Sequence, residues 1–321
     1  MSSGIEQRVD ASLALLNDHV ASMSMTAPAP SRLLEHAYEG LSRCALGGKH
    51  LRARLVHISA GEVTGGQLQA ATVFGACVDM LHGAFLIHDD IIDRDDTRRG
   101  HATVHAAVRD EFGDAHLGTS VAITAGDLGL NAAVGLLIES QLEDGLVRQA
   151  LRILHAAAQR TIVGEILDIA HSVEDAPEPE LVRLSNHLKT ADYSFGAPLK
   201  LGALAAGRDP APMEPIAREL GRAYQAADDI AGTVGQSVET GKLAGGDVLH
   251  GRATLMTMRM GPGADVDPLR LAEIISDVVG EGQAHLEVAR TLIDKAVLGP
   301  GIRDDLHGMT DRIERMLRTY A

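Results

Sequence analysis

Aromatic side chains are scarce in this chain of 321 residues, which has four phenylalanines, four tyrosines and no tryptophan. Aliphatic residues are plentiful, and such a composition favours helices over a β-sandwich, whose strands are usually rich in aromatic and β-branched residues. The two cysteines, Cys44 and Cys77, are too few for a disulfide framework and lack the spacing of metal ligands. We therefore expect a helical protein of the reducing cytoplasm.

Positive charge is also in deficit. The chain has 29 lysines and arginines against 44 aspartates and glutamates, a formal net charge of −15. Such a surface repels phosphate backbones and anionic lipids, so we expect no nucleic-acid partner. No run approaches 18 apolar residues, which predicts no stable membrane insertion. Residues 1–20 contain acids and no continuous apolar core, which indicates no signal peptide.

No linker rich in Pro, Gly or Ser divides the chain, so we expect residues 1–321 to form a single domain. Apolar residues recur at helical spacing along most of it. Helices are predicted over 5–22, 31–45, 51–63, 67–93, 115–140, 143–172, 178–207, 212–231, 267–280, 282–297 and 302–320, with a loop at 232–252 and no strand. Many long helices with short connections predict an all-α bundle with ligand sites in its core.

The densest chemistry lies in residues 82–100, where an apolar half is followed by five aspartates and three arginines. On a helix, Asp89 and Asp93 lie one turn apart on one face. Their charges repel, and a hard cation such as Mg²⁺ suits oxygen ligands placed in this way. Arg98 and Arg99 offer forked donors that match phosphate oxygens. The stretch predicts a diphosphate site at the mouth of an apolar cavity; the alternative is a solvated acidic helix end.

Two further segments could bind anions or metal. Lys49 and Arg52 follow Gly47-Gly48 at a helix start, where the dipole favours anions, although a helix break with two solvated cations explains them as well. A second acidic pair, Asp228 and Asp229, ends another apolar helix. Acids at a helix C-terminus oppose the dipole, and that local cost indicates function.

Two more segments carry cations. The glycine-rich stretch 240–255 contains Lys242 and Arg252, and is typical of a mobile lid over phosphates or of an ordinary surface loop. Lys189, followed by Thr190, lies within an apolar helix. A lysine in that position either extends to water or pairs with an anion.

Together and in this order, the motifs resemble those of the trans-isoprenyl diphosphate synthases, the polyprenyl synthetase family. Asp89-Asp90-Ile91-Ile92-Asp93 with Arg98-Arg99-Gly100 matches the family's first aspartate-rich motif and its Arg-Arg-Gly. Gln225 with Asp228-Asp229 matches the second aspartate-rich motif, and Lys242 matches a loop lysine.

The chain departs from the family pattern at several positions. His50 and Ala53 replace Arg and Pro in a segment resembling Gly-Gly-Lys-Arg-x-Arg-Pro. Glu165 stands for Gln in Gly164-Glu165-Ile166-Leu167-Asp168, which resembles Gly-Gln-x-x-Asp. Gly232 stands where the second motif has its third Asp, and Arg252 stands for a second loop lysine.

The resemblance implies the isoprenoid synthase fold around a central apolar cavity, a homodimer, and three Mg²⁺ ions per site with substrate bound. Asp89 and Asp93 would hold two ions and Asp228 the third, and the catalytic residues would be these three and Lys189. The allylic diphosphate would contact Arg98, Lys189, Thr190, Gln225, Lys242 and Arg252. Isopentenyl diphosphate would contact Lys49, Arg52, His82 and Arg99.

The implied activity is a short-chain trans-prenyltransferase that condenses isopentenyl diphosphate with an allylic diphosphate. On the helix that ends near Asp89, Phe85, Leu81 and Val78 lie about one turn deeper each, or about 5.4 Å. Small Ala84 beside Phe85 would leave a path past it, and the position just before Phe85 is not aromatic, which resembles a strict farnesyl enzyme less than a geranylgeranyl one. We therefore expect geranylgeranyl diphosphate (C20), with farnesyl diphosphate (C15) as the main rival.

Three other readings stay open. A class I terpene cyclase shares the α-fold and the first acidic motif, but needs no second diphosphate site such as Lys49, Arg52 and Arg99 suggest. A non-catalytic regulatory subunit of a heteromeric synthase would explain His50 and Gly232. A metal-binding helical scaffold would require all the motifs to coincide in order.

Overall fold

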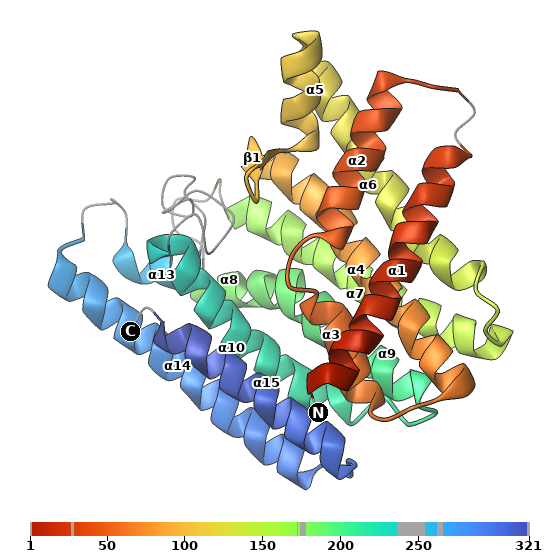
Figure 1. The fold of residues 1–321 in the computed structure, drawn as a ribbon. Helices are drawn as coiled ribbons and strands as arrows, with labels where there is room; N and C mark the ends of the chain where they lie inside the picture. Colours follow the sequence, from red (N-terminus) through yellow and green to blue (C-terminus); the bar gives the residue numbers. More distant parts are fainter. Residues whose placement is uncertain are drawn as a thin grey trace. The chain divides into compact units, whose positions relative to one another are not determined.

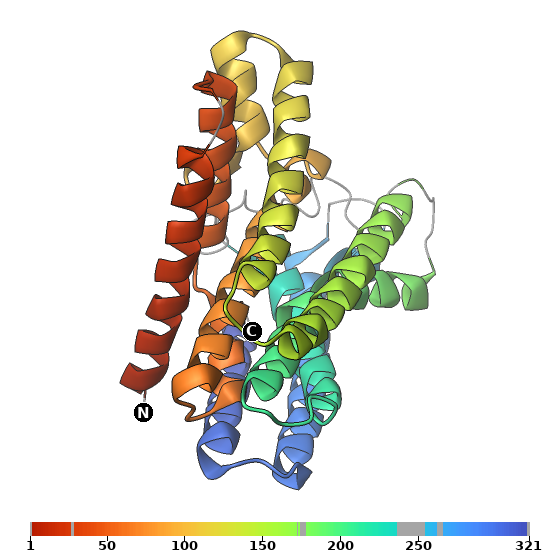
Figure 2. The same ribbon diagram turned by 90° about the vertical axis from the view of Figure 1, so that its right-hand side faces the viewer.

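The computed structural model describes residues 2–26, 29–171, 173, 178–235, 254–261 and 266–319, so Lys242 and Arg252 lie outside the described residues. The described chain is almost entirely helical, which confirms the all-α class (Figures 1 and 2). It forms two compact units, Met1–Arg152 with Leu201–Arg208, and Ile153–Lys200 with Asp209–Ala321. A single domain over residues 1–321 stays a prediction.

The first unit is built around helix α4. Its elements are α1 (Ser2–Met25), α2 (Arg32–Leu46), α3 (Leu51–Ala60), α4 (Gly65–Ile92), β1 (Thr97–Arg98), β2 (His101–Ala102), α5 (Val104–Phe112), α6 (Ala115–Ile138) and the start of α7 (Asp144–His171). Helix α4 contacts α1, α2, α3 and α6, and most of its residues from Ala70 to Ile87 are buried (Figure 1). A helix that is apolar all round belongs in a core, and α4 fills that place.

Glycines bring the helices of this unit close together. A Cβ atom added to Gly83 of α4 would lie 2.7 Å from backbone atoms of Ala45 in α2. One added to Gly129 of α6 would lie 2.8 Å from the Cβ of Ala84 in α4. The backbones themselves therefore fill the space that large side chains fill in other cores, which suits a chain with few aromatic residues.

Polar contacts fix α1 against α3. The Ser12 hydroxyl lies 2.9 Å from Nε2 of His57, and both residues are fully buried. Burial, with the Arg8 charge nearby, lowers the pKa of His57 to about 4, so the imidazole is neutral at neutral pH. At the surface, Arg54 of α3 pairs with Glu6 of α1 at 2.6 Å.

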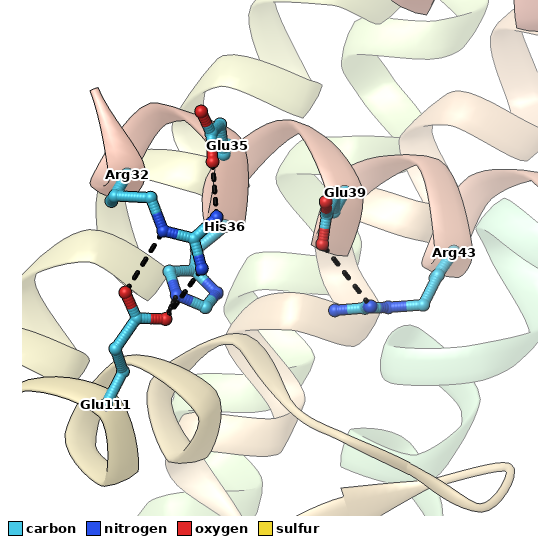
Figure 3. Close-up of polar contacts among 6 residues, drawn as sticks. All are labelled: Arg32, Glu35, His36, Glu39, Arg43 and Glu111. Atoms are coloured by element: carbon cyan, nitrogen blue, oxygen red, sulfur yellow. Dashed lines mark hydrogen bonds and ion pairs between the residues drawn. The ribbon is translucent and has the colours of Figure 1, made fainter. Parts of the chain in front are cut away.

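Helix α5, which the sequence analysis missed, is linked to α2 by the ion pairs in Figure 3. Arg32 donates to both carboxylate oxygens of Glu111, at 3.1 and 2.9 Å, and Nε2 of His36 lies 2.7 Å from the same carboxylate. Farther along α2, Arg43 and Glu39 pair at 3.8 Å. The contacts with Glu111 orient α5 more than they stabilise it, because exposed ion pairs contribute little free energy.

The second unit is built around α10. Its elements are the rest of α7, α8 (Pro179–Asn186), the π-helix η1 (His187–Gly196), the start of α9 (Ala197–Ala205), α10 (Met213–Val234), α13 (Leu255–Met260), α14 (Pro268–Lys295) and α15 (Pro300–Arg318). Helix α10 contacts η1, α13, α14 and α15, and the last two form an antiparallel hairpin (Figures 1 and 2). Gly221 of α10 lets η1 approach, since a Cβ there would lie 2.5 Å from that of Ala191.

The predicted helix boundaries differ from the structure in informative places. The predicted break between 280 and 282 is wrong, because α14 is continuous and Gly282 provides room for Leu317 of α15. The predicted helix over 178–207 contains the π-helical segment η1. The short elements β1, β2, α5 and α13 were missed because hydrophobic periodicity needs a longer window.

Two helices among the described residues, α4 and α6, are long and apolar enough to cross a membrane by length and composition alone. Continuous apolar runs did not reveal them, because glycines and isolated polar residues interrupt those runs. Of the most apolar window, 83% is buried in α4 and 50% in α6. Such burial is what the core helix of a folded unit requires.

We predict that Gly83→Ala destabilises the protein by about 1–3 kcal/mol, because the added methyl meets the backbone of Ala45, which cannot rotate away. The measurement is urea denaturation followed by circular dichroism. The matched control is Gly135→Ala in α6, where the nearest atom to a Cβ would lie at 3.7 Å. It should stabilise the helix by up to about 1 kcal/mol; equal effects would contradict the packing argument.

Candidate active site

The first aspartate-rich motif lies at the C-terminal end of α4. Because α4 extends to Ile92 and ends on Asp93, Asp89 and Asp93 lie one turn apart, and the Asp93 amide donates to the Asp89 carbonyl at 2.8 Å. The side chain of Asp89 is 20% exposed, whereas that of Asp90 is only 3% exposed. The two adjacent carboxylates therefore have different environments, one accessible and one buried.

Arg98 lies on these carboxylates. Its Nε donates to Oδ1 of Asp90 at 2.6 Å, and its Nη2 donates to Oδ2 of Asp89 at 3.3 Å. Arg98 is itself only 12% exposed, so this is a largely buried ion pair. From sequence, Arg98 was expected to bind a diphosphate and Asp90 had no expected role; in the structure, Arg98 also compensates the buried charge of Asp90.

A tight hairpin positions Arg98 and Arg99. In the antiparallel pair β1–β2, Arg98 lies opposite His101, and Arg99 and Gly100 form the two-residue turn. Their φ angles of +50° and +78° are both left-handed, the pattern of a type I′ turn. The Arg99 guanidinium lies against Gly47 and Gly48, since Cβ atoms on these glycines would be 2.6 and 2.7 Å from its nitrogens.

Asp96 anchors this hairpin to α5. Its Oδ1 accepts from Nη1 of Arg109 at 2.8 Å and its Oδ2 from Nη2 at 3.3 Å, while its carbonyl accepts from the Thr103 amide at 3.0 Å. The hydrogen bond from Arg109 lowers the pKa of Asp96. The hairpin is therefore attached to α5 through Asp96 and to α4 through Arg98.

Cations crowd around His82 of α4. Burial, followed by the guanidinium groups of Arg52, Arg99 and Arg98, holds the pKa of His82 well below its ordinary value. Partial desolvation and the neighbouring Arg98 likewise lower the pKa of Arg99. His82 is thus neutral at neutral pH and can donate a hydrogen bond without adding charge, whereas the arginines supply a positive field that an anion would relieve. Lys49, just before the start of α3, is exposed.

In the second unit, Lys189 of η1 lies between two carboxylates of α7. Its Nζ is 2.9 Å from Oε2 of Glu165 and 3.0 Å from Oδ2 of Asp168. Gly164 makes this approach possible, since a Cβ there would lie 2.4 Å from the Lys189 amide nitrogen. Thr190 follows in the same π-helical segment, a local distortion that is frequent at functional sites.

The second aspartate pair lies within the last two turns of α10, which continues to Val234. Asp228 is exposed, whereas Asp229 is only 2% exposed. The Asp229 carboxylate accepts from Nε2 of Gln225 at 2.6 Å and from the amide of Leu255, the first residue of α13, at 2.9 Å. Asp229 and Gln225 thus secure the start of α13, and Asp228 presents its carboxylate outward.

The donor chemistry fits Mg²⁺. Asp89, Asp93 and Asp228 offer only carboxylate oxygens, the ligands that this ion prefers. Within the described ranges, no three His, Cys, Asp or Glu side chains gather into a metal site. Mg²⁺ usually takes one or two carboxylates and completes its coordination with water and substrate phosphates.

The predicted chain-length residues lie on different faces of α4. Phe85 is half-buried, and Leu81 and Val78 are buried at helical spacing below it. Ala84 instead packs against Gly129 of α6, so its small size serves a helix contact. This contact does not test the predicted role of Ala84 in opening a path past Phe85, which stays a prediction.

Comparison with known proteins covers most of both units. The sequence pattern of the family described as Polyprenyl synthetase matches residues 33–290, most of the chain. The chain belongs to the polyprenyl synthetase family. Geranylgeranyl diphosphate synthase from Mycobacterium tuberculosis is 34% identical to it over 216 residues, 65% of this chain and 57% of that relative. Farnesyl diphosphate synthase from Escherichia coli is 32% identical over 220 residues, 65% of this chain and 70% of that relative.

A solved structure extends the likeness to nearly the whole chain. Geranylgeranyl pyrophosphate synthase from Corynebacterium glutamicum, complexed with isoprenyl diphosphate and magnesium, has a TM-score of 0.86 at 25% identity. The match covers 97% of this chain and 99% of that chain. The predicted isoprenoid synthase fold is therefore confirmed. The match to the M. tuberculosis relative, by contrast, spans less than two thirds of that protein's length.

We predict that Arg98→Gln lowers the free energy of unfolding by about 3 kcal/mol, because it leaves the buried carboxylate of Asp90 without its countercharge. Arg99→Gln, one residue along the hairpin, should change it by less than about 0.5 kcal/mol, because Arg99 is exposed. Urea denaturation of both variants checks the difference. If both variants lose equally little stability, Arg98 is not the countercharge on which the burial of Asp90 depends.

Proposed function

We propose that this protein is a short-chain trans-prenyltransferase that condenses isopentenyl diphosphate with an allylic diphosphate, with geranylgeranyl diphosphate as the main product. One observation carries the proposal: the accessible carboxylates of Asp89 and Asp93 end an apolar helix beside a separate group of cations around His82. Such an enzyme needs metal-binding carboxylates for one diphosphate and cations for a second. The relatives named geranylgeranyl and farnesyl diphosphate synthases support it.

The residues divide between the two substrates. Asp89, Asp93 and Asp228 would hold Mg²⁺ ions, three per site, which neutralise the charge of the allylic diphosphate as it leaves. Arg98, Lys189, Thr190 and Gln225, with Lys242 and Arg252 outside the described residues, would contact that same diphosphate. Lys49, Arg52, His82 and Arg99 would bind isopentenyl diphosphate.

The reaction follows from this placement of charge. The bond between the allylic carbon and the diphosphate oxygen breaks, and the double bond of isopentenyl diphosphate attacks the resulting carbocation. A proton is then lost to the departing diphosphate. Neutral His82 would hold the second substrate by a hydrogen bond, and the apolar side chains of α4 would keep water from the cation.

We also propose that the protein is a cytoplasmic homodimer. Helix α6 of the first unit carries exposed apolar side chains, Ile123 at 46%, Val134 at 36% and Ile138 at 64%. An apolar stripe of this kind is typical of an interface between subunits. Both cysteines, Cys44 and Cys77, are free thiols, which suits a reducing compartment.

The test of the activity is to incubate the purified protein and Mg²⁺ with labelled isopentenyl diphosphate and each allylic starter in turn. We expect linear prenyl diphosphates, and we expect Asp89→Ala to reduce turnover by about 10²-fold or more, because it removes a metal ligand. Asp304→Ala, which removes an exposed carboxylate of α15, is the matched control. A hydrocarbon product would indicate a terpene cyclase, and an inert protein that needs a second subunit would indicate a regulatory chain.

Product length is tested on the inner face of α4. Phe85→Ala and Leu81→Ala should each lengthen the product by at least one isoprene unit, because they deepen a cavity whose wall rises by about 5.4 Å per helical turn. Chain length is read by chromatography of the dephosphorylated products. Leu86→Ala, on a different face of α4, should leave it unchanged. If neither of the first two variants lengthens the product, this face does not form the floor of the cavity.

A further inference from the structure

Lys189 is doubly paired within its own unit. The ammonium group lies 2.9 Å from the carboxylate of Glu165 and 3.0 Å from that of Asp168, and the three side chains are 23%, 18% and 19% exposed. One positive charge faces two negative ones, so this group of three side chains carries a net charge of −1. It is an unfavourable place for an anion to bind while both ion pairs stay intact.

The backbone holds the three side chains in register. Gly164 brings α7 against the Lys189 backbone, and one turn earlier Arg160 of α7 pairs with Asp192 of η1 at 3.0 Å. Because Glu165 and Asp168 are three residues apart, both project toward the same part of η1. The pairing of Lys189 with both carboxylates is therefore set by the packing of the two helices and does not depend on flexible side chains alone.

One of the two carboxylates departs from the pattern that the chain otherwise resembles. The segment Gly164-Glu165-Ile166-Leu167-Asp168 has a carboxylate at its second position, where the resembling motif Gly-Gln-x-x-Asp has a neutral amide. An amide could still accept a hydrogen bond from Lys189, but it would not neutralise its charge. The extra charge thus lies next to Lys189.

We propose that Glu165 is a positioning residue that competes with the allylic diphosphate for Lys189. This inference rests on the proposed function, in which Lys189 contacts that diphosphate. To do so, the ammonium group must give up part of its interaction with Glu165, which weakens the binding of the allylic substrate and of released diphosphate. Glu165 therefore raises the KM for the allylic substrate and favours release of diphosphate after each condensation.

The test is Glu165→Gln, which keeps the shape of the side chain and removes its charge. Inorganic diphosphate with Mg²⁺, titrated calorimetrically, should bind about fivefold more tightly to the variant, the equivalent of one partly buried ion pair. The KM for the allylic substrate should fall by a similar factor, while the KM for isopentenyl diphosphate stays constant. Glu165→Ala should shift both quantities in the same direction, and circular dichroism confirms that each variant is folded.

Two comparisons separate competition for Lys189 from a general effect of charge. Glu180→Gln removes a carboxylate of α8 that is 88% exposed, and should not change diphosphate binding. In a Lys189→Ala background, Glu165→Gln should no longer tighten binding, because the group for which it competes is gone.

Unchanged or weaker diphosphate binding in Glu165→Gln would overturn the inference, as would equal tightening with Lys189 present and absent. The outcome is separable from that of the proposed function. If the wild-type protein forms no prenyl product with any starter while Glu165→Gln still binds diphosphate more tightly, the proposed reaction fails and the role of Glu165 stands. If wild type elongates normally and the variant binds diphosphate as wild type does, only the role of Glu165 fails.

Discussion

Each aspartate pair lies within the last two turns of its helix, and at the end of α4 the terminal carbonyl groups add partial negative charge. Two carboxylates cannot both be buried there without compensation. In both units the first aspartate of the pair, Asp89 or Asp228, keeps contact with solvent, and the second is buried and satisfied. Asp90 is satisfied by Arg98, and Asp229 by Gln225 and the amide of Leu255.

The buried member of each pair organises a neighbouring element of the chain. Asp90 fixes Arg98, and with it the hairpin whose turn directs Arg99 toward Gly47 and Gly48. Asp229 fixes the first turn of α13. The chemistry assigned to Asp89 and Asp228 thus depends on the buried aspartates Asp90 and Asp229, which need not contact a ligand themselves. Each of them sets the local backbone from which the accessible carboxylate projects.

Much of this was predictable from sequence, because long helices and charged motifs leave strong local signals. The all-α class, the extent of α4 and the shared helical turn of Asp89 and Asp93 all follow from periodicity. The structural role of Asp90, the anchoring of Asp96 by Arg109 and the pairing of Glu165 with Lys189 did not, since each joins residues from different elements. The break predicted between residues 280 and 282 was wrong, because a glycine such as Gly282 that makes room for a neighbouring helix has the same sequence signal as a helix break.

The hairpin turn also involves a trade-off between stability and function. Arg99 has a left-handed backbone conformation, which costs a residue with a side chain roughly 1–2 kcal/mol. Asparagine is better suited to that position of a type I′ turn, so selection for stability alone would replace this arginine. A laboratory search for more thermostable variants would therefore replace Arg99 early, because the replacement increases stability. The protein would then lose a cation that the proposed reaction requires.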